Sequence, residues 1–255
     1  MNKIINHSEM LDVANRLLEL AREYVSRSSF LDLKSLNDAV TDFDYYMQEQ
    51  IRSALNLLEP DMPILSEEEI FACDSKSSWI IDPLDGTSNY IQGLGPIAFV
   101  AARVQGAEVV ASFVVDASSG DIYTAVRGGG VQLNGESFSR NPTRIKLIGV
   151  STGYLNRGGK IPKGMNARIL GSQALHLCLV ARGVLFGCVN YEAKAWDDVA
   201  GSLVLSEAGG AYKNQFEGED WVDLALGGMS LGSSASCQAF DIDEIASLVG
   251  DINDG

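Results

Sequence analysis

Residues 79 to 90, WIIDPLDGTSNY, place two carboxylates directly after an apolar run. The apolar residues 79–81 are typical of a buried strand, whereas Asp, Pro, Gly and Asn favour turns and helix caps. Asp82 and Asp85 therefore lie where a strand leaves the core, and their spacing directs both carboxylates toward one region, as in many functional sites. The alternative interpretation is an Asp-Pro turn that leads into a helix N-cap and has no chemical role.

Two further acidic segments strengthen the chemical interpretation. Glu67 and Glu68 belong to the charged run 66–69, which alone would indicate a solvated loop, and Asp197 opens a predicted helix, where it could simply be an N-cap. Together with Asp82 and Asp85, these residues supply oxygen ligands without histidine, a set that suits Mg²⁺ rather than zinc.

The turn that follows Asp85 adds a site for an anion. Gly86 and Thr87 begin a predicted helix, whose backbone N–H groups and positive dipole end favour a negatively charged group. Carboxylates that hold a hard cation next to an anion-binding helix end are suited to the chemistry of a phosphate ester. The sequence therefore predicts a metal-dependent phosphate site.

Regular elements that could position these residues are visible along the whole chain. Ser8 can cap one helix, and a second begins near Thr41 or Asp42, turns Met47, Ile51, Ala54 and Leu58 inward, and stops at Pro60. Residues 97–104, 109–115 and 121–126 read as strands of a meander. The pattern then changes to strand 145–150, helix 172–181, strand 184–189 and helix 197–208.

This order predicts a layered α/β fold of two halves that form one compact unit and share a cleft. We expect residues 1–143 to carry the metal-binding loop, and residues 144–255 to carry the substrate pocket and the last metal ligand. With 255 residues, 46% of them hydrophobic, the chain can bury a sizeable core.

Charge and composition exclude several classes of partner. The 19 Lys and Arg against 34 Asp and Glu give a net charge of −15, which repels nucleic acid and anionic membrane surfaces. The four cysteines have no CxxC spacing, which indicates reduced thiols rather than zinc ligands. No secretory signal and no apolar stretch of about 18 residues is visible, so we expect a cytoplasmic protein.

Several motifs carry a resemblance to a known family. IIDPLDGTSNY (80–90) and WDDVAGSLVLSEAGG (196–210) resemble the two signatures of the inositol monophosphatase family. VTDFD (40–44), ILSEEE (64–69) and GSQALHLCLVARG (171–183) fall in the matching order. The resemblance implies an alternating α-β-α-β-α sandwich, a magnesium-dependent and lithium-sensitive phosphatase, and a homodimer.

The resemblance also implies roles for the acidic residues. One Mg²⁺ ion would be held by Glu67, Asp82 and the carbonyl of Leu84, and a second by Asp82, Asp85 and Asp197. A third, weaker ion near Glu67 would bring the number to two or three per site.

Further roles for the neighbouring residues follow from the same resemblance. Thr87, hydrogen-bonded to Asp44, would orient the attacking water, and Glu67 or Glu68 would help to draw off its proton. The phosphoryl group would be held by Asp85, Gly86 and Thr87.

The substrate pocket is where this sequence departs most from the family pattern. Residues 171–173 (Gly171, Ser172 and Gln173) match the segment that lines the pocket, although Ser172 could equally be a helix N-cap. Asn190 stands where inositol-cleaving relatives carry a glutamate, and Glu192 would face the same side if the strand continued. Ser66 replaces a glycine of the family pattern.

The predicted function is Mg²⁺-dependent hydrolysis of a small phosphorylated metabolite, namely an inositol, polyol or sugar monophosphate. Alternatives within the family are a nucleotide 3′-phosphate or histidinol phosphate as substrate. A regulatory module that binds other proteins is the alternative from another class, and the intact acids argue against it.

Overall fold

The computed structural model describes residues 4–24, 31–35, 38–69, 75–141, 145–236 and 242–253. Within these ranges the helices are α1 His7–Tyr24, α2 Asp42–Leu58, α3 Thr87–Ile91, α4 Thr152–Asn156, α5 Gln173–Ala181, α6 Ala195–Glu207, α7 Trp221–Gly227 and α8 Ile242–Asn253. The strands are β1 Leu31–Ser35, β2 Asp38–Thr41, β3 Ile64–Ser66, β4 Ser77–Asp85, β5 Ala98–Gln105, β6 Glu108–Asp116, β7 Ile122–Val126, β8 Gly130–Leu133, β9 Glu136–Ser137, β10 Leu147–Val150, β11 Asn166–Arg168, β12 Gly187–Asn190, β13 Ala211–Lys213 and β14 Ser233–Ser236.

The larger strands form two sheets with different connectivity. In the described residues, a seven-stranded sheet has the order β3-β4-β5-β6-β7-β8-β9, and a five-stranded sheet has the order β11-β10-β12-β14-β13. All neighbours in the first sheet are antiparallel except β3 and β4, whereas β10 pairs in parallel with both β11 and β12. The predicted meander is β5 to β7, and each of its strands begins and ends within one residue of the expected position.

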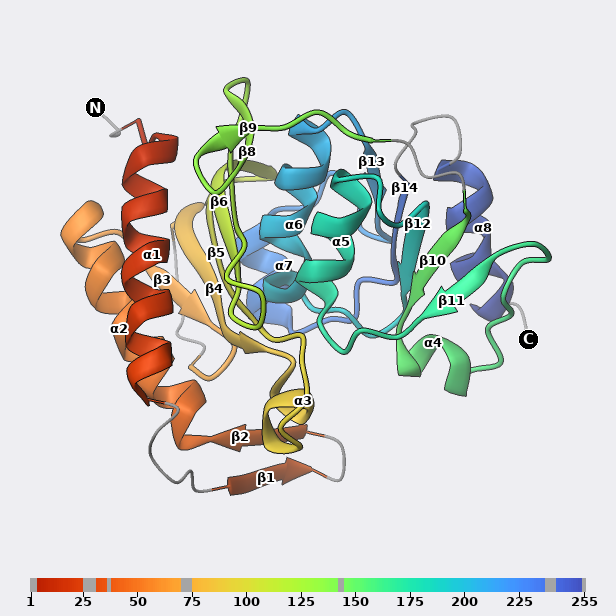
Figure 1. Ribbon diagram of the computed structural model, residues 1–255, viewed down its shortest axis with the longest axis horizontal. Coiled ribbons are helices and arrows are strands. Elements are labelled where there is room, and N and C mark those ends of the chain that lie inside the picture. Colours follow the sequence, from red (N-terminus) through yellow and green to blue (C-terminus); the bar gives the residue numbers. More distant parts are fainter. Residues whose placement is uncertain are drawn as a thin grey trace.

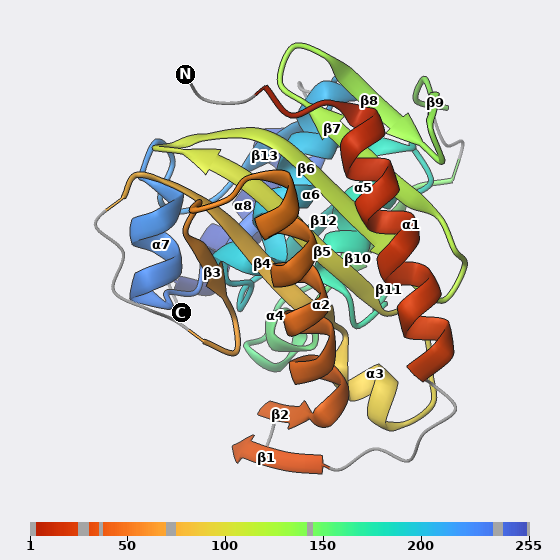
Figure 2. The same cartoon turned by 90° about the vertical axis from the view of Figure 1, so that its left-hand side faces the viewer.

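Helices and sheets alternate across the molecule, as predicted. Helices α1 and α2 cover one face of the seven-stranded sheet, α5 and α6 lie between the two sheets, and α8 lies on the far face of the five-stranded sheet (Figure 1). Figure 2 shows α1 and α2 lying across the seven-stranded sheet. The fold is therefore the expected α-β-α-β-α sandwich.

Strand β4 is buried on both faces. Trp79 and Ile81 belong to the apolar cluster under α1 and α2, whereas Ile80 belongs to the cluster around α5 and α6. A strand covered on both faces is apolar without interruption, which explains the continuous run before Asp82. The strand that carries the predicted acids therefore runs through the centre of the sandwich.

Helix ends agree only partly with the predictions. Helix α2 begins at Asp42, as expected, and Thr41 caps it, because its side chain accepts hydrogen bonds from the backbone of the first turn. The predicted cap Ser8 is wrong, because α1 begins at His7 and Asn6 caps it through reciprocal bonds with Glu9. The prediction that Ala54 points inward is also wrong, because Leu55 and not Ala54 is among the buried residues of α2.

Some predictions fall on residues outside the described ranges, namely the division near residue 143 and Cys73 and Cys237. Cys178 and Cys188 are buried and free. In the described part of the chain, no helix is both long and apolar enough to cross a membrane.

Candidate active site

The end of β4 places the first pair of acids. Asp82 lies opposite Val100 of β5, and Asp85 lies opposite Ala98, so β4 has one extra residue in a bulge between the two acids. Asp82 is buried and accepts a hydrogen bond from the backbone N–H of Leu84 at 2.9 Å. The extra residue thus lets Asp82 and Asp85, three positions apart, pair with Val100 and Ala98, which are two positions apart on one face of β5.

Gly86 makes the sharp turn from β4 into α3. Its φ is +106°, and a Cβ at this position would lie 3.1 Å from the carbonyl oxygen of Pro96. A side chain is disfavoured here both by the backbone conformation and by this close approach. Glycine is therefore required where the predicted anion-binding turn begins.

The carboxylate of Asp85 is held by the start of α5. The Ser172 hydroxyl donates to Asp85 Oδ2 at 2.7 Å, the Ala174 N–H donates to the same oxygen at 2.8 Å, and the Gln173 N–H donates to Oδ1 at 3.2 Å. Burial raises the pKa of Asp85 to about 6, although these three donors act to lower it. Asp85 joins β4 to the helix that carries the predicted substrate segment.

Thr87 contacts Asp44 as the sequence predicted. Its hydroxyl lies 3.1 Å from Asp44 Oδ1 and 2.9 Å from the carbonyl oxygen of Leu84. Asp44 Oδ2 also accepts a hydrogen bond from the Thr41 backbone at 2.8 Å, which fixes the first turn of α2. Burial is the main reason that the pKa of Asp44 is raised. Helix α2 therefore holds Thr87 through a buried carboxylate.

Asp197 lies in the first turn of α6 and has a capping role. The backbone N–H of Lys194 donates to Asp197 Oδ2 at 2.7 Å, so the helix-cap interpretation describes part of what Asp197 does. Its pKa is nevertheless raised well above the ordinary value, first by burial and then by the charges of Asp85 and Glu67.

Asp82 shows the same mutual repulsion. Burial raises its pKa well above the ordinary value, and the charges of Glu67, Asp85 and Asp197 raise it further. Glu67 lies in the turn after β3, where its N–H donates to the Ile81 carbonyl at 3.3 Å. The predicted ligands are thus neighbours that destabilise one another's ionised forms.

This set of donors suits a divalent cation, because a cation would offset the repulsion among buried carboxylates that offer only oxygen ligands. Among the residues that the structure describes, however, no three His, Cys, Asp or Glu side chains are arranged to hold a metal ion together. Both oxygens of Asp85 accept hydrogen bonds from the start of α5.

A cavity of about 470 Å³ lies next to these acids. Asp85 and Asp197 line it together with the predicted substrate residues Gly171, Ser172, Gln173, Asn190 and Glu192. The other predicted residues, which are Asp44, Glu67, Glu68, Asp82, Leu84, Gly86 and Thr87, are not among its described lining residues. The structure thus brings acids from both signatures to one cavity and leaves the remaining predicted residues outside its lining.

Asn190 and Glu192 reach the cavity in a different way from that predicted. Strand β12 ends at Asn190, whose Oδ1 accepts hydrogen bonds from the N–H groups of Glu192 at 2.9 Å and Ala193 at 3.1 Å. The strand therefore does not continue to Glu192, and alternation along a strand does not place Glu192 on the same side as Asn190, as was predicted. The turn itself brings Glu192 over Gly153, where a Cβ would collide with its carboxylate.

Sequence reasoning missed Asn89 as a residue that links the two sides of the cavity. Its Nδ2 donates to the carbonyl oxygens of Pro96 and Leu170, both at 2.8 Å. The sequence predicts only a turn residue at Asn89, whereas the structure places it in α3. The neighbouring residues give no sign of Leu170, which is 81 positions away.

Sequence reasoning also missed Asp198. This side chain is fully buried, accepts hydrogen bonds from Gln173 Nε2 at 2.8 Å and from the Tyr212 hydroxyl at 2.9 Å, and has a pKa that burial raises to about 6. An available signal was that α6 is apolar around most of its circumference, so a charge in its first turn requires buried partners.

A layered fold with acids beside a cavity suits the hydrolysis of a phosphate ester with a hard cation. The model of the inositol monophosphatase family matches residues 7–239. The chain therefore belongs to the inositol monophosphatase family.

Individual relatives agree with this assignment. The chain is 34% identical to an inositol-1-monophosphatase of Rhizobium meliloti, over 75% of this chain and 78% of that protein. It is also 34% identical to the Nus factor SuhB of Pasteurella multocida, over 79% of this chain and 83% of that protein. A solved IMPase/NADP phosphatase complexed with Mg²⁺ and phosphate has the same fold, with a TM-score of 0.79 and 19% identity over 94% of this chain and 92% of that one.

Proposed function

We propose that this protein hydrolyses a small phosphate monoester of an inositol, a polyol or a sugar with the help of Mg²⁺. The observation that carries the proposal is the position of Asp85 and Asp197. They come from different signatures and from different halves of the chain, yet both line the cavity that contains the substrate segment 171–173. The relatives add support, because one is named an inositol-1-monophosphatase and the solved phosphatase contains Mg²⁺ and phosphate.

We infer that Glu67, Asp82, Asp85, Asp197 and the carbonyl of Leu84 would hold two or three Mg²⁺ ions. Bound magnesium would supply an activated water and would neutralise negative charge that develops on the phosphoryl group and the leaving oxygen. A cation would also lower the raised pKa values of Asp82, Asp85 and Asp197, because it favours their ionised forms.

The residues around the turn would orient the reacting groups. Thr87 is held by Asp44 and can accept a hydrogen bond from the attacking water, while Glu67 or Glu68 would take its proton. The backbone N–H groups at Gly86 and Thr87 would bind phosphoryl oxygens. The alcohol would lie in the cavity against Asn190 and Glu192, where a carboxylate and an amide can bind hydroxyl groups.

A regulatory role is a second candidate, because the Pasteurella relative is named a Nus factor. The two candidates differ in what the acids must do. A binding module does not need buried carboxylates that raise one another's pKa, whereas a metal-dependent hydrolase does. The acidic cluster therefore favours the enzyme.

A phosphate-release assay tests the proposal. The purified protein would be given inositol monophosphate, a sugar phosphate, a nucleotide 3′-phosphate and histidinol phosphate, with Mg²⁺, after exhaustive chelation, and with millimolar lithium. We expect magnesium-dependent, lithium-sensitive turnover that is fastest with the inositol or sugar phosphate. Full activity after chelation would refute the metal mechanism, and preference for either of the other two substrates would refute the substrate class. Absence of turnover on all four, with folded protein, would favour the regulatory candidate.

A further inference from the structure

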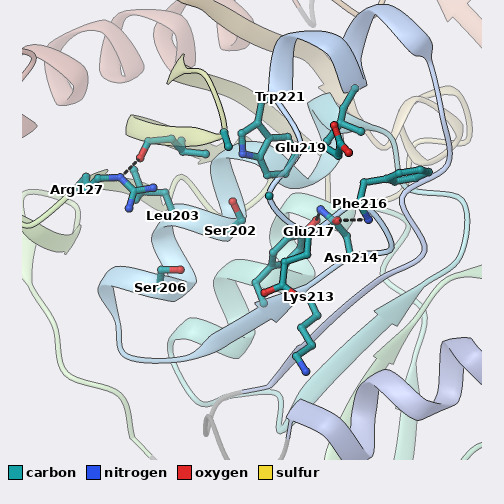
Figure 3. A pocket seen from close by; sticks show the side chains of 15 residues that line it. Arg127, Ser202, Leu203, Ser206, Lys213, Asn214, Phe216, Glu217, Glu219 and Trp221 are labelled. Atoms are coloured by element: carbon teal, nitrogen blue, oxygen red, sulfur yellow. Dashed lines mark hydrogen bonds between the residues drawn. The ribbon is translucent and has the colours of Figure 1, made fainter. Parts of the chain in front are cut away.

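A second cavity of about 350 Å³ lies away from the acids, between α6, α7 and the segment that follows β13. It shares no described lining residue with the catalytic cavity. Leu203 and Ser206 of α6, Trp221 of α7 and Phe216 of the intervening segment contribute to its wall (Figure 3). The catalytic chemistry proposed above does not use this cavity.

The wall offers aromatic surface for a ring. Trp221 is only 6% exposed, and its ring centroid lies 6.4 Å from that of Tyr212. Phe216 and Leu203 extend the apolar surface. The volume lies within the range of small-molecule sites. Polar side chains line the cavity together with the aromatic rings, namely Arg127, Ser206, Lys213, Asn214, Glu217 and Glu219.

The rim of the cavity carries opposite charges at separate positions. Arg127 lies on one side, and Glu217 and Glu219 lie on the other (Figure 3). Arg127 Nε donates to the Val109 carbonyl at 2.9 Å, and Nη1 is 4.0 Å from the exposed Glu108, which makes a weak ion pair. The two outer nitrogens of the guanidinium can therefore bind a carboxylate. Lys213 also lines the cavity, but its ammonium lies 2.5 Å from Asp243. A ring that carries one carboxylate and one ammonium would match this arrangement.

A chain of hydrogen bonds joins this cavity to Asp85. The Tyr212 hydroxyl donates to Asp198 Oδ2 at 2.9 Å, and Gln173 Nε2 donates to Asp198 Oδ1 at 2.8 Å. The backbone N–H of Gln173 then donates to Asp85 Oδ1 at 3.2 Å. Because Asp198 is fully buried, displacement of Tyr212 would remove a hydrogen-bond donor from Asp198 Oδ2 that water could not readily replace, and the network would have to rearrange.

We propose that this cavity binds a small aromatic zwitterion, of which an aromatic amino acid is the simplest example, and that its occupancy acts on Asp85 through Tyr212, Asp198 and Gln173. The coupling rests on the proposed phosphatase function, whereas the binding does not. Ligand and metal site would then influence each other's affinity by the same factor.

Calorimetric titration of the full chain tests binding without any catalysis. The probes are L-tryptophan and L-phenylalanine, with tryptamine and indole-3-propionate as analogues that each lack one charge. We expect saturable binding of at least one amino acid and a loss of roughly tenfold or more in affinity for each analogue, as for a charged hydrogen bond. No binding of either amino acid, or equal binding of the analogues, would overturn the proposed ligand class.

Matched variants locate the bound amino acid. Ser206→Trp places a large side chain in the cavity wall and should abolish binding, whereas Ser53→Trp makes the same change at an exposed position of α2, across the seven-stranded sheet, and should not. Equal affinities of the two variants would overturn the assignment of binding to this cavity.

Phosphate release with and without L-tryptophan tests the coupling. We expect the amino acid to change kcat or KM of the unmodified protein by about fivefold or more, the lower end of ordinary coupling between two sites. Tyr212→Phe should still bind the amino acid by calorimetry yet lose this response. If Tyr212→Phe does not fold, Asp198→Asn is the second variant that alters the same hydrogen-bond route, and it keeps the side-chain volume. An equal response in the variant would overturn the proposed route. Absence of turnover in every protein would refute the proposed function and leave the calorimetric result to decide binding.

Discussion

Replacing Gly171 by alanine is expected to destabilise the protein and weaken the link between the two sides of the catalytic cavity. Gly171 has a φ of +80°, and a Cβ there would lie 2.6 Å from Nδ2 of Asn89. That nitrogen donates the hydrogen bonds to Pro96 and Leu170, so a new methyl group must displace the side chain that joins these two segments.

The expected magnitude has two parts. A non-glycine residue in the left-handed region costs about 1–2 kcal/mol. Displacement of Asn89 removes two hydrogen bonds, each worth about 0.5–1.5 kcal/mol. The free energy of unfolding should therefore fall by about 2–5 kcal/mol in total.

Urea unfolding followed by circular dichroism measures this change, and Gly158→Ala is the matched control. Gly158 has a φ of +86° but no atom within 4 Å of its Cβ position, so its replacement should show only the backbone part. In an Asn89→Ala background, Gly171→Ala should likewise show only the backbone part, because the side chain that it would displace is already absent. Equal losses for Gly171→Ala and Gly158→Ala, or strict additivity with Asn89→Ala, would refute this reasoning.

Three further predictions concern the acids, the substrate and pH. In Asp197→Asn the side chain can still accept the Lys194 N–H but has lost its charge, so phosphate release should collapse while the melting temperature is largely kept. The control is Asp223→Asn, which makes the same change at an exposed position. Normal turnover in folded Asp197→Asn would contradict a metal role. Asn190→Glu should raise kcat/KM for inositol monophosphate relative to a sugar phosphate and a nucleotide 3′-phosphate by about 1–3 kcal/mol of transition-state binding. If kcat/KM changes by the same factor for all three substrates, the side chain at this position does not contact the alcohol part of the substrate. Burial lowers the pKa of His176 from 6.5 to about 4. Between these two pH values the unfolded chain binds a proton at His176 and the folded protein does not, which favours unfolding. The free energy of unfolding of the unmodified protein, measured by urea unfolding relative to His176→Gln, should therefore fall by about 2 kcal/mol between neutral pH and pH 5. The comparison with His176→Gln cancels Asp85 and Asp198, whose raised pKa values act in the opposite direction in both proteins.

The sequence alone determined the main elements and the type of chemistry. The strand before Asp82, the meander that follows and the start of α2 near Asp42 agree with the predictions, because periodicity acts within a few positions of the chain. Carboxylates without histidine also predicted a hard-cation site from residue types alone, and this site stays a prediction. Where two local signals competed, as for Ser8 and Asn6 at the start of α1, the choice of cap was wrong.

The tertiary structure decided which side chains meet. Asp85 faces the first turn of α5, Asn89 joins Pro96 to Leu170, and Asp198 connects Gln173 to Tyr212. These partners lie on elements far apart in the sequence, and no pattern of period 2 or 3.6 encodes a contact across layers. Burial then set the pKa values of the acids, since the free energy of removing a carboxylate from water depends on what surrounds it in the folded protein.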